Sequence, residues 1–323
     1  LEILGDMLSN SKFDAVEIER EKGVIIEELN MYEDNPIMHV EDVLESCLYG
    51  DTPAGRDTIG TKKNIRAFKR SDFLRYFRRQ YGAHSTFVIL SGSIRPADKA
   101  AAAKIFGIFP INTWRNKIAV KEKQEQPLLK IVNKKTDQIN LALALRTVPV
   151  GHSQELALKL LSVILGGSMS SRLFISLRER SGLAYYVKTT AEFYSDSGYL
   201  STQAGVPKGQ TEEAVKIILS EYRRIASEDV STEELARAKD VVSGRLLMRL
   251  EASDEVASWY GRQAVLREHL SDPDEVEKKL RSLKVSDIRQ AARMIVKNNG
   301  LNLAIIGQIS SSEKKNLQAA LKL

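Results

Sequence analysis

The segment GGSMSSRLFISLRERSGLAY, residues 166–185, is the most specific pattern in the sequence. Its two glycines stand before a serine-rich stretch, and this combination permits a tight entry into a helix, which we expect at 171–180. A glycine-rich turn of this kind can also cradle a phosphate group. However, the strand, loop and lysine of a P-loop do not accompany it, so nucleotide binding is not expected.

The residues around this segment predict a sheet packed with helices. The expected elements, in chain order, are a strand at 139–145, a helix at 154–165, and strands at 185–193 and 199–204. The last two strands are joined by the polar turn Ser195–Gly198, which is a hairpin signal. A long helix is then expected from Ser231, with Glu234 in the register of a capping box.

The sequence also contains an internal duplication. Residues 71–92 and 286–307 each begin with Ser-Asp, where a serine N-cap is expected, and each ends in an apolar run closed by glycine. Residues 17–25 match residues 234–242, in the same order along the chain. We therefore expect two copies of one α+β domain. The first copy shows only helices and a terminal strand, so its strand-rich front is expected to be missing.

The boundary between the copies is expected near residue 120, because the charged stretch 121–127 reads as a connector. The first, incomplete domain then covers residues 1–120 and the second covers residues 121–323. Each is expected to hold an antiparallel sheet with helices on one face.

Composition is typical of a globular protein. Apolar residues make up 43% and charged residues 28% of the 323 residues, so a sizeable core is expected. No apolar run approaches the roughly 18 residues of a membrane span, and the net charge of +6 is spread along the chain. Arginines near Phe73, Phe77 and Tyr81 suggest a nucleic-acid module, but aromatic residues every fourth position indicate a packing stripe. Neither a membrane nor a nucleic-acid partner is expected.

The single cysteine, Cys47, excludes an internal disulfide and any multi-cysteine metal site. We expect it to be a buried apolar group in a helix. A reducing, cytoplasmic compartment fits this cysteine usage, and a signal segment upstream of Leu1 is left open.

Glu21 and Glu28 are seven residues apart, so on a helix they share one face, with Val24 and Ile25 between them. Acidic residues are rare on an apolar face, because burial of an unpaired carboxylate is costly. The face is therefore either half buried or met by a positive group. A solvated, charge-rich helix is the plainer interpretation of the spacing alone.

The run at 19–28, continuing to Asp34-Asn35-Pro36, resembles the segment that follows the HxxEH helix in M16 peptidases, the inverted zincins of pitrilysin, insulinase and processing-peptidase type. The resemblance covers essentially the whole chain. It implies two similar α+β domains in a clamshell arrangement and a zinc-dependent endopeptidase that cleaves extended or unfolded peptides. It also implies that Glu28 is a zinc ligand and that Glu21 is an acid supporting the metal site.

Residues 166–185 resemble the M16 pattern in which an arginine and a tyrosine seven residues later take part in catalysis. By position these are Arg178 and Tyr185. The resemblance implies that the arginine grips carbonyl groups of the peptide and that the tyrosine hydroxyl supports the oxyanion. A slip of one residue on a strand would select Tyr186 instead.

The histidine pair of HxxEH is absent from this sequence. The four histidines are His39, His84, His152 and His269, and none stands in that motif. Catalytic zinc needs about three protein ligands, so this chain alone is expected to hold no Zn²⁺ and to be inactive. Two functions stay open: an active peptidase of which this chain is a part, or a non-catalytic M16 homologue that acts as partner or scaffold. A homodimer or an M16 heterodimer is the expected assembly.

Overall fold

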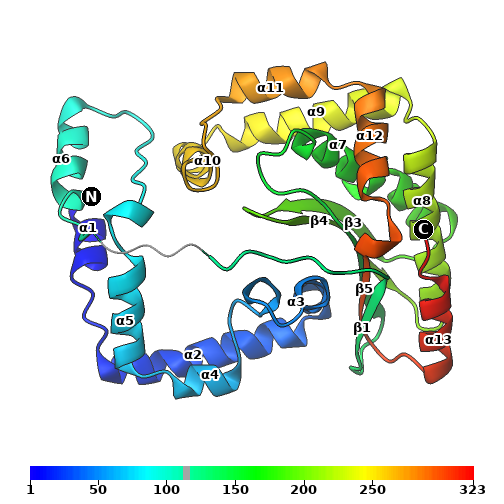
Figure 1. Cartoon of the computed structure of the whole chain (residues 1–323), viewed down its shortest axis with the longest axis horizontal. Helices are drawn as coiled ribbons and strands as arrows, with labels where there is room; N and C mark the ends of the chain where they lie inside the picture. Colours follow the sequence, from blue (N-terminus) through cyan, green and yellow to red (C-terminus); the bar gives the residue numbers. More distant parts are fainter. Residues whose placement is uncertain (112–116) are drawn as a thin grey trace. The chain divides into compact units, whose positions relative to one another are not determined.

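The computed structural model describes residues 1–111 and 117–323 and divides into two compact units (Figure 1). Unit 1 holds residues 1–31, 58–118 and 247–271, and unit 2 holds residues 32–57, 119–246 and 272–323. Each unit contains residues from before and after the expected boundary near residue 120. The two-domain division at that boundary and the clamshell arrangement stay predictions. Among the described residues, no helix combines the length and the apolar character needed to cross a membrane.

Unit 2 is built on a five-stranded sheet with the strand order β1-β5-β2-β4-β3. The strands are β1 Leu128–Val132, β2 Ile139–Arg146, β3 Tyr186–Phe193, β4 Gly198–Val206 and β5 Leu301–Ile306. The three strands predicted in this region are confirmed. β1 is missing from the prediction, because it follows the charged connector without a turn signal. The expected antiparallel sheet is in fact mixed, because β1 runs parallel to β5.

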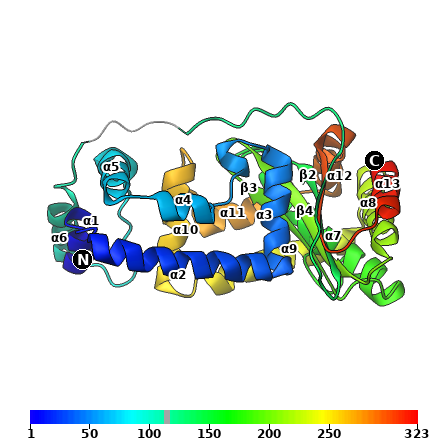
Figure 2. The ribbon, with the colours of Figure 1, turned by 90° about the horizontal axis from the view of Figure 1, so that it is seen from below.

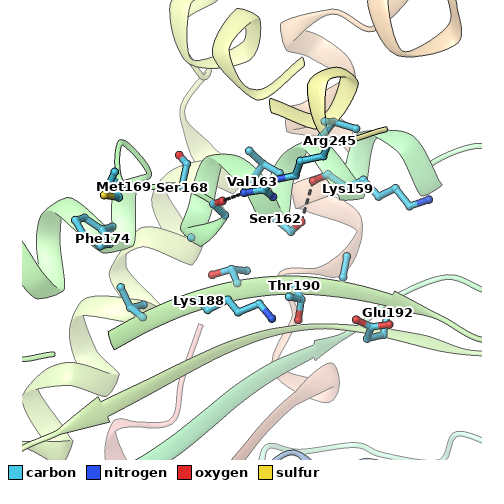
Figure 3. Close-up of a pocket in the computed structure, with 16 residues that line it drawn as sticks. Lys159, Ser162, Val163, Ser168, Met169, Phe174, Lys188, Thr190, Glu192 and Arg245 are labelled. Carbon is cyan, nitrogen blue, oxygen red and sulfur yellow. Dashed lines mark hydrogen bonds between the residues drawn. The ribbon is translucent and has the colours of Figure 1, made fainter. Parts of the chain in front are cut away.

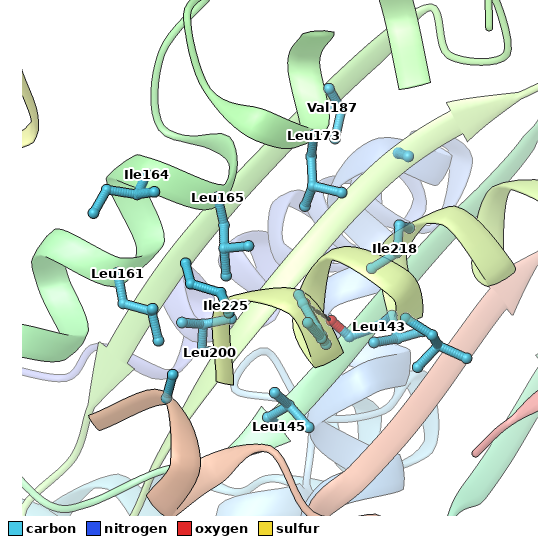
Figure 4. Close-up of a cluster of buried hydrophobic side chains, with 14 of the residues drawn as sticks. Leu143, Leu145, Leu161, Ile164, Leu165, Leu173, Val187, Leu200, Ile218 and Ile225 are labelled. Carbon is cyan, nitrogen blue, oxygen red and sulfur yellow. Dashed lines mark hydrogen bonds between the residues drawn. The ribbon is translucent and has the colours of Figure 1, made fainter. Parts of the chain in front are cut away.

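Helices cover one face of this sheet and enclose the main core of unit 2 (Figure 4). The helices of unit 2 are α3 Pro36–Tyr49, α7 Glu155–Gly166, α8 Thr211–Ser227, α9 Thr232–Arg249, α11 Pro273–Ser282, α12 Val285–Ile295 and α13 Ser311–Ala320. Alternate residues of β2, namely Leu141, Leu143 and Leu145, are buried against α7, α8 and α12. The predicted capping box of α9 is confirmed, since Ser231 N–H donates to Glu234 at 2.9 Å and Glu234 N–H donates to Ser231 Oγ at 3.1 Å.

The helix α3 lies on the opposite face of the sheet from α8 and α13 (Figure 2). It starts where the Asn35 side chain accepts the N–H of Ile37 at 3.2 Å, with Pro36 as its first residue. Val40, Leu44 and other apolar residues of α3 pack on the small residues Ala142, Ala144 and Ala304 of the sheet. The sheet is therefore covered by helices on both faces rather than on one. Cys47 is only partly buried within α3.

Asp42 of α3 is a partly buried acid with other acids near it. Burial, together with the negative charges of the neighbouring Asp57, Glu45 and Glu41, raises the pKa of Asp42 to about 6. Because the folded state then binds a proton more tightly than the unfolded chain, stability falls as pH rises from about 4 to about 6 and is flat above.

We therefore expect Asp42→Asn to raise the free energy of unfolding at pH 7 by about 1 kcal/mol, a value reduced for partial solvent exposure. The variant should also lose the decline in stability between pH 4.5 and pH 7. Denaturant titrations at both pH values measure this, with the exposed Asp137→Asn as the matched control. Equal stability of Asp42→Asn and the parent chain at pH 7 would contradict the assignment.

Unit 1 contains helices and no strand among its described residues. Its elements are α1 Glu2–Ser9, most of α2 Ala15–Asp34, α4 Lys62–Ala67, α5 Arg70–Gln80, the 3-10 turn Ala83–Ser85, α6 Pro96–Phe106 and α10 Ser253–Leu266. The terminal strand predicted for the first copy is wrong for this structure: the apolar run at 87–91 is not a strand, and Phe87 is 55% exposed. A strand needs a neighbour to pair with, which β5, its counterpart in the second copy, finds in β1 and β2.

The aromatic stripe of α5 packs as expected. The Phe13 ring lies 6.2 Å from Phe73 and 5.2 Å from Phe77 between ring centroids. Phe77 in turn stacks on Tyr81 at 4.9 Å. These aromatic residues therefore pack against one another within unit 1, and the arginine side chains between them are exposed to solvent.

The two copies repeat an unusual lysine contact. In unit 1 the buried Lys22 donates from Nζ to the carbonyl of Arg66, at 3.4 Å. In unit 2 its counterpart Lys239 donates to the carbonyl of Arg281, at 2.8 Å. Because both the donors and the acceptors are counterparts in the sequence, these contacts support the alignment of the copies.

The start of the following helix is repeated too. The N–H of Lys69 donates to Asp72 at 2.9 Å, and that of Lys284 donates to Asp287 at 2.7 Å. The expected serine N-caps are therefore wrong in both copies: each helix begins one residue before the serine, and the aspartate makes the cap.

Candidate functional site

The chain turns back on itself between Arg178 and Tyr185. The carbonyl of Leu177 accepts the N–H of Leu183 at 2.8 Å and the N–H of Ala184 at 3.2 Å. Gly182 takes a positive φ of 62° at this turn, a conformation that glycine adopts without strain. Arg178 and Tyr185 directly follow the bonded residues, so this turn brings their backbones to the same end of η3 and β3.

Arg178 lies in an unusual helix. The predicted helix at 171–180 is present, but residues Phe174–Arg180 (η3) form a π-helix. Such wide turns are rare in proteins as a whole, and those that occur often lie at functional sites. Arg178 is exposed and forms no hydrogen bond or ion pair with any described residue. Its guanidinium carbon instead lies over the Phe174 ring, 5.0 Å from the centroid.

The two neighbouring tyrosines differ sharply in environment. Tyr185 is 64% exposed, just before β3 begins. Tyr186 is partly buried, donates from its hydroxyl to Asn140 at 3.1 Å, and has its pKa raised to about 12 by burial. Tyr186 therefore serves packing, while the hydroxyl of Tyr185 is available to a ligand. This difference agrees with the choice of Tyr185, whose catalytic role stays a prediction.

A pocket of about 630 Å³ opens between the end of α7, strand β3 and helix α9 (Figure 3). Gly166 and Gly167 are among the residues that line it. A Cβ on Gly166 would lie 2.2 Å from Thr189 Oγ1, so α7 and β3 approach closely only because of glycine. Arg245 of α9 reaches the same end of α7 and donates from Nη2 to the carbonyl of Gly167 at 2.7 Å. Phe174, Lys188 and Glu192 also line this pocket.

The carboxylates Glu21 and Glu28 stand on α2 in unit 1. This helix is started by Asp14, whose carboxylate accepts the N–H of Val16 at 2.8 Å. Both glutamates are exposed, and neither forms a hydrogen bond or ion pair with a described residue. Val24 between them is 55% exposed, so this face of α2 is largely open to solvent, which agrees with the plainer interpretation of a solvated helix.

The second copy has no acid at these positions. The counterpart of Glu21 is the buried Ala238, and the counterpart of Glu28 is Arg245, which lines the pocket against α7. The fold itself therefore requires no carboxylate there.

The residues present do not fit a zinc ion by themselves. Across residues 1–111 and 117–323, no three His, Cys, Asp or Glu side chains come together as a metal site. Glu28 is a single candidate ligand, whereas catalytic zinc takes about three from the protein.

Comparison with known proteins decides the family. A model described as "Peptidase M16 inactive domain" matches residues 67–242, and one described as "Insulinase (Peptidase family M16)" matches residues 1–62. An uncharacterized zinc protease of Bacillus subtilis (strain 168) is 30% identical over 296 residues, which are 91% of this chain and 72% of that protein. The chain belongs to peptidase family M16.

Other M16-like proteins agree with this. An uncharacterized zinc protease of Rickettsia bellii is 30% identical over 312 residues, which are 95% of this chain and 74% of the relative. The crystal structure of a protease from Helicobacter pylori superposes with a TM-score of 0.87 at 20% identity, covering 94% of this chain and 75% of that chain. This structural likeness shows the fold, and it confirms the predicted α+β class.

Two features of the candidate site are missing from the sequence-based prediction. One is the π-helical winding of η3, for which the sequence has no signal. The other is the contact of Arg178 with Phe174, which the spacing of four residues on a helix could have indicated.

Proposed function

We propose that this chain is part of a zinc-dependent endopeptidase that cleaves extended or unfolded peptides. In this proposal Arg178 grips peptide carbonyls and the Tyr185 hydroxyl donates to the oxyanion. The observation that carries it is the turn anchored on Leu177, which presents an exposed, ionically unpaired guanidinium and an exposed phenol from adjacent backbone. Membership of a family with relatives named zinc proteases supports the reaction class.

The edge of the sheet supports an extended peptide as substrate. β3 is the last strand in the order β1-β5-β2-β4-β3, so among the described residues one side of it has no strand partner. An extended peptide can add to such an edge through its main chain. Tyr185 directly precedes β3, so a peptide on that edge would end beside its hydroxyl.

The described residues do not complete a zinc site by themselves. We propose that Glu28 contributes one ligand, supported by Glu21, to a site completed by the two histidines of HxxEH from sequence outside these 323 residues. We refer to a protein that carries both this chain and the HxxEH segment as the complete peptidase. A second M16 subunit, in a homodimer or heterodimer, is the proposed partner.

Peptide binding by this chain tests the proposal without metal. Arg178→Ala should weaken the affinity for fluorescein-labelled β-casein, an unfolded polypeptide, by about 10-fold, since a hydrogen bond from a charged donor contributes about 1.5–3 kcal/mol. Fluorescence anisotropy measures the Kd. The matched control is Arg180→Ala, an exposed arginine two residues along, which should bind like the parent chain. Equal losses in both variants would indicate unspecific charge attraction and overturn the assignment.

A further inference from the structure

Phe174 occupies a special place between the core of unit 2 and Arg178. Part of the ring is buried against the main hydrophobic core, and part lines the pocket beside β3. Met169 lines the same pocket, and Figure 3 shows both residues with the others that line it. An aromatic ring held in this way is a fixed platform, because the core limits its rotation.

The Phe174 ring is the partner that the structure gives Arg178 among the described residues. Arg178 forms no hydrogen bond or ion pair with a described residue, and its guanidinium lies 5.0 Å from the centre of the Phe174 ring. A long arginine side chain without partners loses up to about 2 kcal/mol of rotamer freedom when a ligand fixes it. A ring beneath the guanidinium removes part of that loss before the peptide arrives, and it leaves the N–H groups at the rim free to donate.

The π-helix η3 contains both Phe174 and Arg178. Its wide winding is seen where the Ser181 N–H donates to the carbonyl of Ser176, five residues earlier, at 3.2 Å. The bonds from the N–H groups of Leu183 and Ala184 to the Leu177 carbonyl tie this segment to the start of β3.

We propose that Phe174 is a positioning residue for Arg178, holding the guanidinium by a cation–π contact in the place where it meets the carbonyls of a bound peptide. This rests on the proposed function, since it assumes that Arg178 contacts the peptide. Phe174 acts through Arg178 and not through its own contact with substrate.

A double-mutant cycle on this chain tests the proposal, with fluorescein-labelled β-casein as the probe. Phe174→Leu should weaken binding about 2- to 5-fold, the range of an exposed cation–π contact. Phe174→Tyr keeps a ring and should bind like the parent chain. In the Arg178→Ala background, Phe174→Leu should cause no further loss, because the group it positions is gone.

The outcomes separate this inference from the proposed function. Failure of Arg178→Ala to weaken binding overturns the proposed function itself. If Arg178→Ala weakens binding but Phe174→Leu does not, the positioning role is wrong. If Phe174→Leu causes the same loss with and without Arg178, the ring acts through the pocket or through folding, and the proposal is overturned. Circular dichroism melts of each variant identify any loss that follows from unfolding.

Discussion

Glu28→Gln is expected to abolish zinc retention by the complete peptidase, and peptide cleavage with it. An amide is an uncharged and poorer ligand for zinc than a carboxylate, and a catalytic site with about three protein ligands cannot spare one. Glu28 is exposed and unpaired on α2, so the substitution should leave the thermal midpoint of this chain unchanged. Metal analysis after dialysis measures the zinc content.

Two variants of the same helix serve as comparisons. Glu21→Gln should lower metal affinity or activity by about 10- to 100-fold, the usual cost of a change beside the ligands. Glu27→Gln, next to Glu28 and also exposed, should retain full zinc content. If Glu28→Gln held as much zinc as the parent protein, the assignment of this helix to the metal site would be wrong.

The alternative function makes the opposite prediction for these variants. A non-catalytic M16 homologue that serves as partner or scaffold would retain the peptide contacts of Arg178 but have no use for Glu28. Glu28→Gln would then change neither the metal content nor the activity of its complex.

The second copy was largely predictable because its elements complete their own packing. The apolar residues at 139–145 become the central strand β2, buried on both faces, and the Ser231–Glu234 capping box forms as written in the sequence. Local signals and tertiary contacts agree there. The first copy fails at 87–91, where an apolar run has no neighbouring strand among the described residues of unit 1 and stays without strand structure. An apolar run becomes a strand only where a neighbouring strand pairs with it, and the sequence of the run alone does not show whether such a neighbour is present.

The sequence indicates candidate site residues but not their geometry. The motif indicates Arg178 and Tyr185, and the environment of Tyr186, bonded to Asn140, is consistent with that choice. The π-helix has no such sequence signal, because hydrogen bonds to the fifth residue depend on how the segment is anchored at both ends. The histidine pair that the family resemblance implies is not in this sequence, so no structure of these residues alone could assemble the metal site.

The central claim is that unit 2 takes part in peptide cleavage although it holds no metal site among its described residues. Tyr185→Phe tests it most selectively. The change removes one hydroxyl from a side chain that is 64% exposed, so packing and folding should be unaffected. Loss of one donor to an oxyanion typically lowers kcat by about 10²–10³-fold. Tyr186→Phe, which removes a hydroxyl bonded within the fold, is the matched control and should retain kcat.

The measurement is kcat of Tyr185→Phe in the complete peptidase on an unfolded peptide substrate, together with its zinc content and thermal midpoint. The account predicts a fall of about 10²–10³-fold in kcat, with zinc content and midpoint equal to those of the parent protein. Normal turnover by Tyr185→Phe, or a loss of activity that only follows a loss of folded protein, would contradict it.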